Sequence, residues 1–142
     1  MKHDHGVGES RRTGEIYDPN CPFCQRIVLN QIEAEYGTAA ALKDLNPVTP
    51  GHHLVIPKSH ARDFFDLSDR ERLDADRLLI ILSREITAND GTVSGFNIGW
   101  NCGVSAGQTL FHAHCHLIPR RTNDHPHPRG GVRGVIPEKM SY

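Results

Sequence analysis

Hydrophobic residues recur in regular patterns along the chain, and the clearest pattern predicts a helix that begins after Ser68. Ser68 and Glu71 match a capping box, in which each side chain satisfies an otherwise unpaired backbone amide. Beyond this cap, apolar residues recur at intervals of three and four, which places them on one side of a helix. They are Leu73, Leu78, Leu79, Leu82 and Ile86. We expect the helix to end at the turn residues 89–91 and to pack its apolar side against a core.

Other segments have the patterns of β-strands. Residues 38–45 are small and apolar, residues 53–56 form a short apolar run that Pro57 should end, and residues 96–101 and 109–118 alternate apolar and polar positions. We expect Pro119 to end the last of these strands. The segment 21–36 is loosely helical and is followed by Gly37, a typical helix end. The prolines and glycine of residues 46–51 predict a turn.

The length of the chain fits one domain. Its 142 residues suffice for a single buried core. Residues 1–15 are polar and lack periodicity, so we expect a flexible tail in which His3 and His5 are solvated. Residues 16–142 then form one domain, whose last part, from about residue 120 to 142, is rich in Pro, Gly and Arg and resembles a loop.

The charge balance argues against nucleic acid or membrane as a partner. Lys and Arg number 16 and Asp and Glu 17, so no strong positive field attracts phosphate backbones or anionic lipid. No apolar run is long enough for a transmembrane helix, and the N-terminal segment lacks the apolar core of a secretory signal. We therefore expect a soluble, cytoplasmic protein.

Histidine is the residue type that points to chemistry, with ten in the chain. His112, His114 and His116 alternate, so on a strand they would project from one face. Three adjacent imidazoles serve no packing purpose, whereas imidazole acts as metal ligand, general acid or base, or nucleophile near neutral pH. Neutral donors surround the triad, and such donors suit a phosphate or an oxyanion. They are Asn97, Asn101, Gly103, Gly107, Gln108 and Thr109.

The four cysteines include the pair Cys21 and Cys24, with two residues between them. In a cytosolic chain such a pair indicates a metal site or a redox site rather than a disulfide framework. The surroundings lack the strand–CxxC–helix context of a redox motif. We expect Cys102 and Cys115 to be structural, with Cys115 on the face opposite the triad.

These motifs together resemble the histidine triad family. The segment from His112 to Ile118 has the family's alternating His pattern, Gln108 and Thr109 precede it as in the family, and residues 44–60 contain Pro-Gly-His and Ile-Pro-Lys-Ser-His elements. The resemblance runs from about Cys21 to Arg121. It implies an α+β fold with an antiparallel sheet and two helices, a homodimer that shares a continuous sheet, and hydrolysis or transfer at the α-phosphate of a nucleotide.

The resemblance also implies a role for each matching residue. His114 would be the nucleophile, His116 and Asn101 would contact the α-phosphate, and Thr109 and His52 would lie near the leaving group. Asp44 would accept the ribose hydroxyls, although an Asp that starts a turn is the alternative interpretation. The expected base is a purine. The remaining residues expected to contact the nucleotide are Gln108, Phe23, Ile27, Leu42 and Leu45. The four apolar residues among them are equally compatible with ordinary core positions.

In the zinc-bearing branch of the family, a histidine pair completes the cysteine site. The matching residues here are Cys21, Cys24, His60 and His112, a ligand set for a closed, structural Zn²⁺ site. An empty site with reduced thiols is the alternative. No organic cofactor is implied.

Two functions remain open at this point. The chain is either an enzyme that cleaves P–N or P–O–P bonds at a nucleoside α-phosphate, or a zinc-stabilised nucleotide-binding module that acts through complex formation. The intact triad favours the enzyme, because a binding module has no need of a free nucleophile. Arg129 and Arg133 of the C-terminal segment could contact an acidic leaving group.

Overall fold

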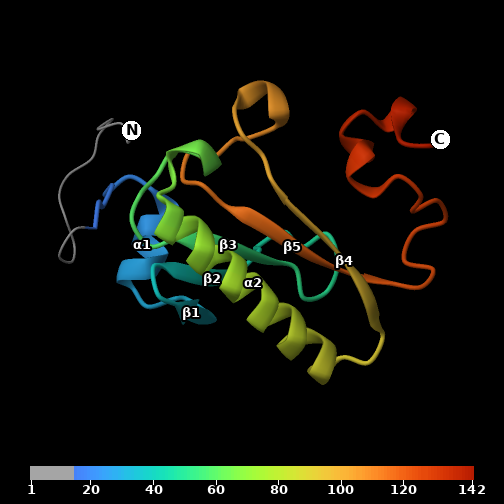
Figure 1. Cartoon of the computed structure of the whole chain (residues 1–142), viewed down its shortest axis with the longest axis horizontal. Helices are drawn as coiled ribbons and strands as arrows, with labels where there is room; N and C mark the ends of the chain where they lie inside the picture. The colour runs from blue at the N-terminus through green and yellow to red at the C-terminus, as the bar shows by residue number, and fades with distance from the viewer. Residues whose placement is uncertain (1–14) are drawn as a thin grey trace.

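The computed structural model describes residues 15–142, and its centre is a five-stranded antiparallel sheet (Figure 1). The strands are β1 (Ala34–Tyr36), β2 (Ala39–Lys43), β3 (His53–Pro57), β4 (Val93–Trp100) and β5 (Cys115–Arg121), in the spatial order β1-β2-β3-β5-β4. Two α-helices, α1 (Pro22–Val28) and α2 (Asp69–Asn89), complete the expected α+β fold. The predicted flexible tail, His3 and His5 included, lies outside the described residues except for Glu15.

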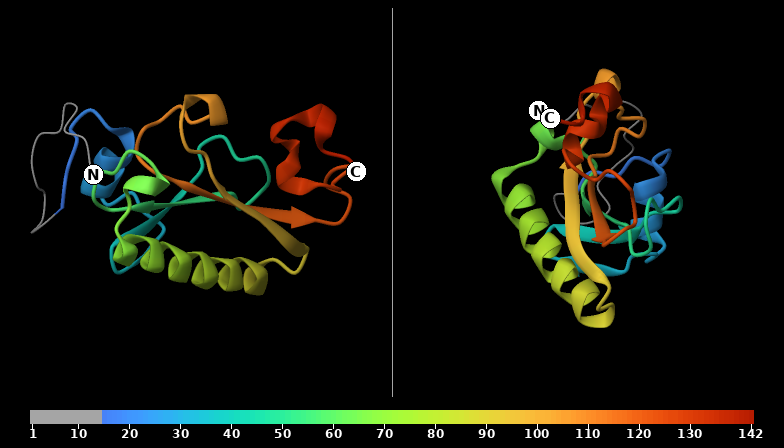
Figure 2. Two further views of the ribbon diagram at one scale, coloured as in Figure 1. Left: turned by 45° about the horizontal axis from the view of Figure 1, so that its top comes forward. Right: turned by 90° about the vertical axis from the view of Figure 1, so that its right-hand side faces the viewer.

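The helix α2 covers one face of the sheet (Figure 2). Leu78, Leu79 and Leu82 pack against Val55, Cys115 and neighbouring residues of β2, β3 and β5 in one buried cluster. The predicted capping box is present, because the Ser68 hydroxyl accepts from the Glu71 amide and the Glu71 carboxylate accepts from the Ser68 amide. No helix in the described part of the chain is long and apolar enough to cross a bilayer.

The short helix α1 packs on the opposite face. Phe23 and Ile27 join Leu42, Leu54 and Ile56 in a second buried cluster. The helix is only seven residues long, so the expectation of a helix over 21–36 is wrong beyond Val28. Asn30 takes a left-handed conformation, with φ of 55°, which ends the helix. Residues 34–36 then form β1, which pairs with β2 across a tight turn.

The strand β5 begins and ends later than the sequence pattern predicts. His112 and His114 lie before it, and the amide of Ala113 donates to the carbonyl of Ala61 rather than to a neighbouring strand. Pro119 does not end β5. The pairing of β5 with β3 ends at Leu117, opposite His53, and beyond that point only β4 flanks the strand. The missing N–H of Pro119 therefore costs no ladder hydrogen bond.

The C-terminal segment folds beside the ends of β4 and β5 (Figure 2). It contains two 3₁₀ turns, η3 (Gly131–Val135) and η4 (Pro137–Lys139), and η3 contacts β4. Two further 3₁₀ turns lie in connecting segments. The turn η1 (Phe64–Asp66) precedes α2, and the turn η2 (Val104–Ala106) lies between β4 and β5. Beyond the end of β5, the C-terminal segment thus consists of loops and 3₁₀ turns and packs beside the sheet.

Candidate active site

The triad histidines gather on the face of the sheet that carries α1. His116 on β5 pairs with Leu54 on β3, and Leu54 belongs to the α1-side cluster. Cys115, one residue earlier, points to the α2-side cluster, opposite the triad as predicted. The alternation of β5 therefore points Cys115 into the α2-side cluster and His116 to the face that also carries the α1-side cluster.

The imidazole of His114 is held in one tautomer. Its Nδ1 lies 2.9 Å from the carbonyl oxygen of His112, and because a carbonyl only accepts, Nδ1 carries the proton. The lone pair is then on Nε2. Burial lowers the pKa of His114 from the ordinary value of 6.5, and the ring of Phe23 stands edge-on at 5.3 Å. His114 is thus a neutral imidazole with a free lone pair at pH 7, which is the form that acts as a nucleophile.

His52 and His116 form a chain of hydrogen bonds with the backbone amide of Val48, and we call this chain the relay. The backbone amide of Val48 donates to Nδ1 of His52 over 3.0 Å, so the proton of this buried ring is on Nε2. That Nε2 lies 2.9 Å from Nδ1 of His116 and donates to it. The remaining nitrogen of His116, Nε2, therefore carries a proton and presents a donor. Burial lowers the pKa of both rings, which keeps the relay uncharged.

The carboxylate of Asp44 lies beside this relay, near both imidazole rings. Its Oδ2 lies 3.3 Å from Nε2 of His52 and 3.9 Å from Nδ1 of His116, and its Oδ1 accepts from the Asn46 amide. The Asn46 contact is the turn-starting arrangement that the alternative interpretation of Asp44 predicts. The three side chains Asp44, His52 and His116 also have metal-ligand spacing, and in this arrangement Nε2 of His52 carries the proton that it donates to the lone pair of His116 Nδ1. This cluster is therefore a hydrogen-bond network.

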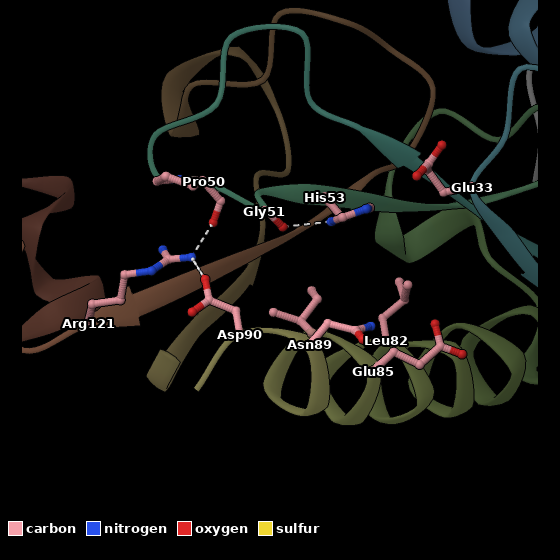
Figure 3. A pocket seen from close by; sticks show the side chains of 10 residues that line it. Glu33, Pro50, Gly51, His53, Leu82, Glu85, Asn89, Asp90 and Arg121 are labelled. Atoms are coloured by element: carbon pink, nitrogen blue, oxygen red, sulfur yellow. Dashed lines mark hydrogen bonds and ion pairs between the residues drawn. The ribbon is translucent and has the colours of Figure 1, made fainter. Parts of the chain in front are cut away.

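Next to His52, His53 faces the other side of the sheet. It lines a pocket of about 320 Å³ between the sheet and the C-terminal end of α2 (Figure 3). The carboxylates of Glu33, Glu85 and Asp90 also line that pocket, together with Arg121, which is paired with Asp90 over 2.8 Å. Carboxylates repel a phosphate, so the face with the triad is the candidate site.

Cys21, Cys24, His60 and His112 meet as the resemblance implies. Their donor atoms all lie within 4.8 Å of one another, and Cys21, Cys24 and His112 are buried. Nε2 of His112 donates to the carbonyl of Pro57 over 2.8 Å, so its Nδ1 lone pair faces the two sulfurs at 3.3 and 3.5 Å. Two thiolates and two imidazoles form the usual donor set of a tetrahedral structural Zn²⁺ site. These four residues fit that set, and we call them the zinc-type site.

The two thiols influence each other strongly. The pKa of Cys21 is lowered because the Cys24 thiol donates a hydrogen bond to it, and the pKa of Cys24 is raised by the same contact. The second thiol therefore loses its proton only when a cation compensates the charge. Nε2 of His60 lies 4.0 Å from a carboxylate oxygen of Asp18, a neighbour that the sequence did not reveal because no motif includes it.

The loop between β4 and the triad holds three of the predicted contact residues. Asn101 is half-buried and lines the cavity that also contains His52 and His116. Thr109 is exposed. Gln108 is buried: its Oε1 accepts from the Gly103 amide, and its Nε2 donates to the carbonyls of Arg62 and Leu110. These bonds fix the loop through the Gln108 amide, and the expected contact of Gln108 with a nucleotide stays a prediction.

The expected base contacts are divided between core and surface. Phe23 borders His114, whereas Ile27 and Leu42 lie inside the α1-side core. Leu45 is 77% exposed in the loop that follows Asp44. Val48, whose amide fixes the tautomer of His52, was not expected from the sequence, since a backbone contact leaves no residue-type signal.

Comparison with known proteins identifies the family. Residues 30–123 match the family model of the HIT domain. An uncharacterized HIT-like protein of Borreliella burgdorferi is 35% identical over 117 residues, which cover 77% of this chain and 80% of that protein. The adenosine 5'-monophosphoramidase hnt1 of Schizosaccharomyces pombe is 34% identical over 110 residues, covering 75% and 78%.

One solved structure that is similar to this chain is that of a zinc-bound protein. The Zn-bound histidine triad family protein of Mycobacterium smegmatis superposes with a TM-score of 0.66 at 29% identity, over 82% of this chain and 90% of that one. The sequence resemblance and the sheet topology agree with these matches. The chain therefore belongs to the HIT domain family.

Proposed function

We propose that the protein hydrolyses nucleotidyl substrates at the α-phosphate, through a covalent nucleotidyl intermediate on Nε2 of His114. The observation that carries the proposal is the 2.9 Å hydrogen bond from Nδ1 of His114 to the carbonyl of His112, which leaves Nε2 unprotonated. The named activity of the Schizosaccharomyces pombe relative, an adenosine 5'-monophosphoramidase, supports a nucleotide hydrolase.

The reaction has two balanced steps. In the first, the Nε2 lone pair of His114 bonds to the α-phosphorus, the bond from phosphorus to the leaving atom breaks, and that atom keeps the electron pair and takes a proton from solvent. In the second, a water oxygen bonds to phosphorus, the P–Nε2 bond breaks, and the electron pair returns to His114. The water proton goes to solvent, and a nucleoside monophosphate is released.

The hydrogen-bond relay supports both steps. His116 donates from Nε2 to a phosphate oxygen, and His52 holds it in the tautomer that allows this. The donor is in place before the reaction, so it stabilises the charge on the phosphate oxygens without reorganisation. We assign Asn101 to the same phosphate, Thr109 to the leaving group and Asp44 to the ribose hydroxyls, with Phe23, Ile27 and Leu45 toward the base.

A Zn²⁺ ion on Cys21, Cys24, His60 and His112 would cross-link α1 to the sheet and to the triad loop. The donor set is closed, with four protein ligands, so the ion supplies structure rather than chemistry. The residues of the chain perform the reaction, and His112 contributes its backbone carbonyl to it.

We also propose a homodimer joined along β4. This eight-residue strand is at the edge of the sheet, with its outer hydrogen-bonding groups available, and Ile98 on it is 49% exposed. A long free edge of this kind pairs readily with another strand. Sedimentation equilibrium tests the dimer, and Ile98→Lys should shift it toward the monomer.

A product assay on metal-replete protein tests the reaction. Wild type and His114→Ala are each incubated with adenosine phosphoramidate and with diadenosine tetraphosphate, and nucleotides are separated by chromatography. We expect AMP from wild type and a loss of about a thousandfold or more in the variant. His53→Gln, on the opposite face of the sheet, is the matched control and should retain full activity.

The same experiment distinguishes the alternative function. If wild type cleaves neither substrate while AMP binds in calorimetry, the chain is a nucleotide-binding module and the hydrolase proposal is wrong. Acid quench during turnover of a substrate labelled in the α-phosphate should trap labelled protein in wild type, and none in His114→Ala.

A further inference from the structure

Residues 16–19 lie beside the zinc-type site and lead into α1 (Figure 1), and we call this segment the strap. The amide of Ile16 donates to the hydroxyl of Ser59 over 2.8 Å, and the carbonyl of Ile16 accepts from the amide of His60 over 2.8 Å. The side chain of Tyr17 packs against the α1-side cluster. The start of the strap is therefore fixed to the segment that carries His60.

The end of the strap bonds to the two cysteines and to α1. The carbonyl of Asp18 accepts from the amide of Cys21 over 3.0 Å, and the amide of Asp18 donates a hydrogen bond to the sulfur of Cys24. The carbonyl of Pro19 accepts from the side-chain amide of Gln25 over 2.7 Å. Three of the four residues of the zinc-type site thus have a direct hydrogen bond to the strap.

The two carboxylate oxygens of Asp18 have different neighbours. Oδ1 accepts from the amide of Asn20 over 2.9 Å, whereas Oδ2 lies 4.0 Å from Nε2 of His60. Nδ1 of His60 lies 3.5 Å from the sulfur of Cys24, so Nδ1 is the nitrogen that faces the metal position and Nε2 carries the proton. The side chains of Asp18 and His60 are 14% and 13% exposed, so water screens the attraction between them only weakly.

His60 is on the open side of the zinc-type site. Cys21, Cys24 and His112 are at most 4% exposed, and His60 is the one member of the four that is not fully buried. A ligand that is partly accessible to water is the one that an incoming chelator or water molecule can replace first. The strap contacts this residue through both its backbone and the carboxylate of Asp18.

We propose that the strap retains the metal of the zinc-type site, and that Asp18 is the positioning residue that holds His60 on it. The inference requires metal at the zinc-type site and is independent of the hydrolase function. Metal exchange proceeds on the side of His60, so this side chain has to swing away and the strap has to open with it. A carboxylate near the second ring nitrogen opposes that movement, because it favours the ring orientation and the tautomer in which Nδ1 binds metal.

The rate of zinc release tests this role of Asp18. Zinc-loaded wild type and Asp18→Asn are mixed with an excess of a chromophoric pyridylazo chelator, and the absorbance of the zinc complex is followed. Asparagine keeps the oxygen that accepts from the amide of Asn20 and removes the charge near His60. We expect release from the variant to be about tenfold to a hundredfold faster, the usual range for the loss of such a partner.

Asp63→Asn is the matched control for this substitution. Oδ1 of Asp63 accepts from the amide of Phe65 over 2.9 Å, the same turn geometry that Asp18 has, but Asp63 caps η1 and makes no ion pair with His60 in residues 15–142. Its zinc release should equal that of wild type. Cobalt(II) loaded in place of zinc adds a spectroscopic measurement: the visible absorption bands should shift in Asp18→Asn and stay unchanged in Asp63→Asn, whereas a general loss of stability leaves the bands of the loaded protein as they are.

The backbone of the strap is tested separately from the charge of Asp18. Ser59→Ala removes the acceptor of the Ile16 amide, and we expect faster zinc release together with faster hydrogen exchange of the amides of residues 16–18 in the zinc-loaded protein. Ser83→Ala is the control, because the Ser83 hydroxyl bonds within α2, to the carbonyl of Ile80. If Ser59→Ala does not fold, Asp18→Asn decides the question alone.

Three results would overturn the inference. Equal zinc release from wild type and Asp18→Asn, with unchanged cobalt bands, would mean that Asp18 only starts the turn at residues 18–20. Equally fast release from Asp18→Asn and Asp63→Asn would mean that both act through general stability. If wild type retains no zinc after purification in zinc-containing buffer, the zinc-type site and the strap proposal both fail, while release of AMP from a nucleotide substrate still tests the hydrolase.

Discussion

His114 donates a hydrogen bond from Nδ1 to the backbone carbonyl of His112, over 2.9 Å, while the imidazole of His112 faces the two sulfurs of the zinc-type site. One residue therefore belongs to both sites, with its side chain in the metal site and its backbone in the active site. Any movement of the His112 backbone changes the direction of the Nε2 lone pair of His114. The zinc-type site and the imidazole of His114 are coupled through this one peptide group.

Loss of the metal should therefore reduce both stability and activity. We expect wild type to bind one zinc ion per chain and Cys24→Ser to bind little, because a closed site needs all four ligands. The thermal midpoint should fall by at least about 5 °C, since the binding free energy of a structural metal contributes to folding. Metal analysis by mass spectrometry and a thermal melt measure the two effects. Cys102→Ser, in a loop outside the site, should retain wild-type values.

The relay from Val48 through His52 to His116 gives a second prediction. His52→Ala removes the donor to Nδ1 of His116, so His116 is no longer restricted to the tautomer that presents a proton to phosphate. We expect kcat/KM to fall about tenfold to a hundredfold. The ¹⁵N shifts of the His116 ring should change from one tautomer to a mixture. If His52 had only a structural role, its substitution would lower the melting temperature and leave the ¹⁵N shifts of the His116 ring unchanged.

The sequence predicts this fold well where the pattern is local. The capping box at Ser68 and the regular leucines place α2 correctly, because both are consequences of contacts within a few residues, but Leu73, expected on the buried side, is 46% exposed. The end of α1 and the strand β1 were missed, since a loosely apolar stretch suits either structure and the pairing with β2 decides it. Pro119 in β5 was missed for the same reason: whether β3 flanks it depends on tertiary structure.

The candidate site divides in the same way. Residue types and their spacing revealed the triad and the Cys21–Cys24 pair, and the family resemblance added His60 and His112 as the partners of the two cysteines. The contacts that set the tautomers are made by the backbone amide of Val48, which any residue except proline could supply, and by the carbonyls of Pro57 and His112, which any residue could supply. The burial of the Gln108 amide, likewise, follows from how the loop folds over it and not from its residue type.

The core under α2 supplies a stability prediction. Leu78 is fully buried in the cluster between α2 and the sheet, and Leu78→Ala leaves a cavity there. We expect a loss of about 2–5 kcal/mol in the free energy of unfolding, measured by urea denaturation in excess zinc. Leu73→Ala on the same helix is the control, because Leu73 is 46% exposed and its loss should be below about 1 kcal/mol. Equal losses at both positions would contradict the assignment of the buried face.

The last prediction concerns pH and the charge of Asp44. Burial lowers the pKa of His52 and His116 from 6.5, and the neighbouring histidines lower that of His116 further, whereas the carboxylate of Asp44 raises both. The relay works only while both rings are neutral, so activity should be lost as pH falls below 6.5 toward these lowered values. Asp44→Asn removes the one negative charge that raises them. Its acid limb should therefore move to lower pH, although substrate binding weakens if Asp44 binds ribose.

Proton NMR of the histidine rings against pH measures this shift directly, and kcat/KM profiles show whether activity follows it. The titration of His116 in Asp44→Asn should fall below that of wild type, with the same sign for His52. A shift to higher pH would mean that loss of the Asp44 contact opens the site to water, because better solvation favours the imidazolium form. In that case Asp44 holds the relay closed, and its ribose role would have to be tested separately, with substrates that lack one of the two ribose hydroxyls.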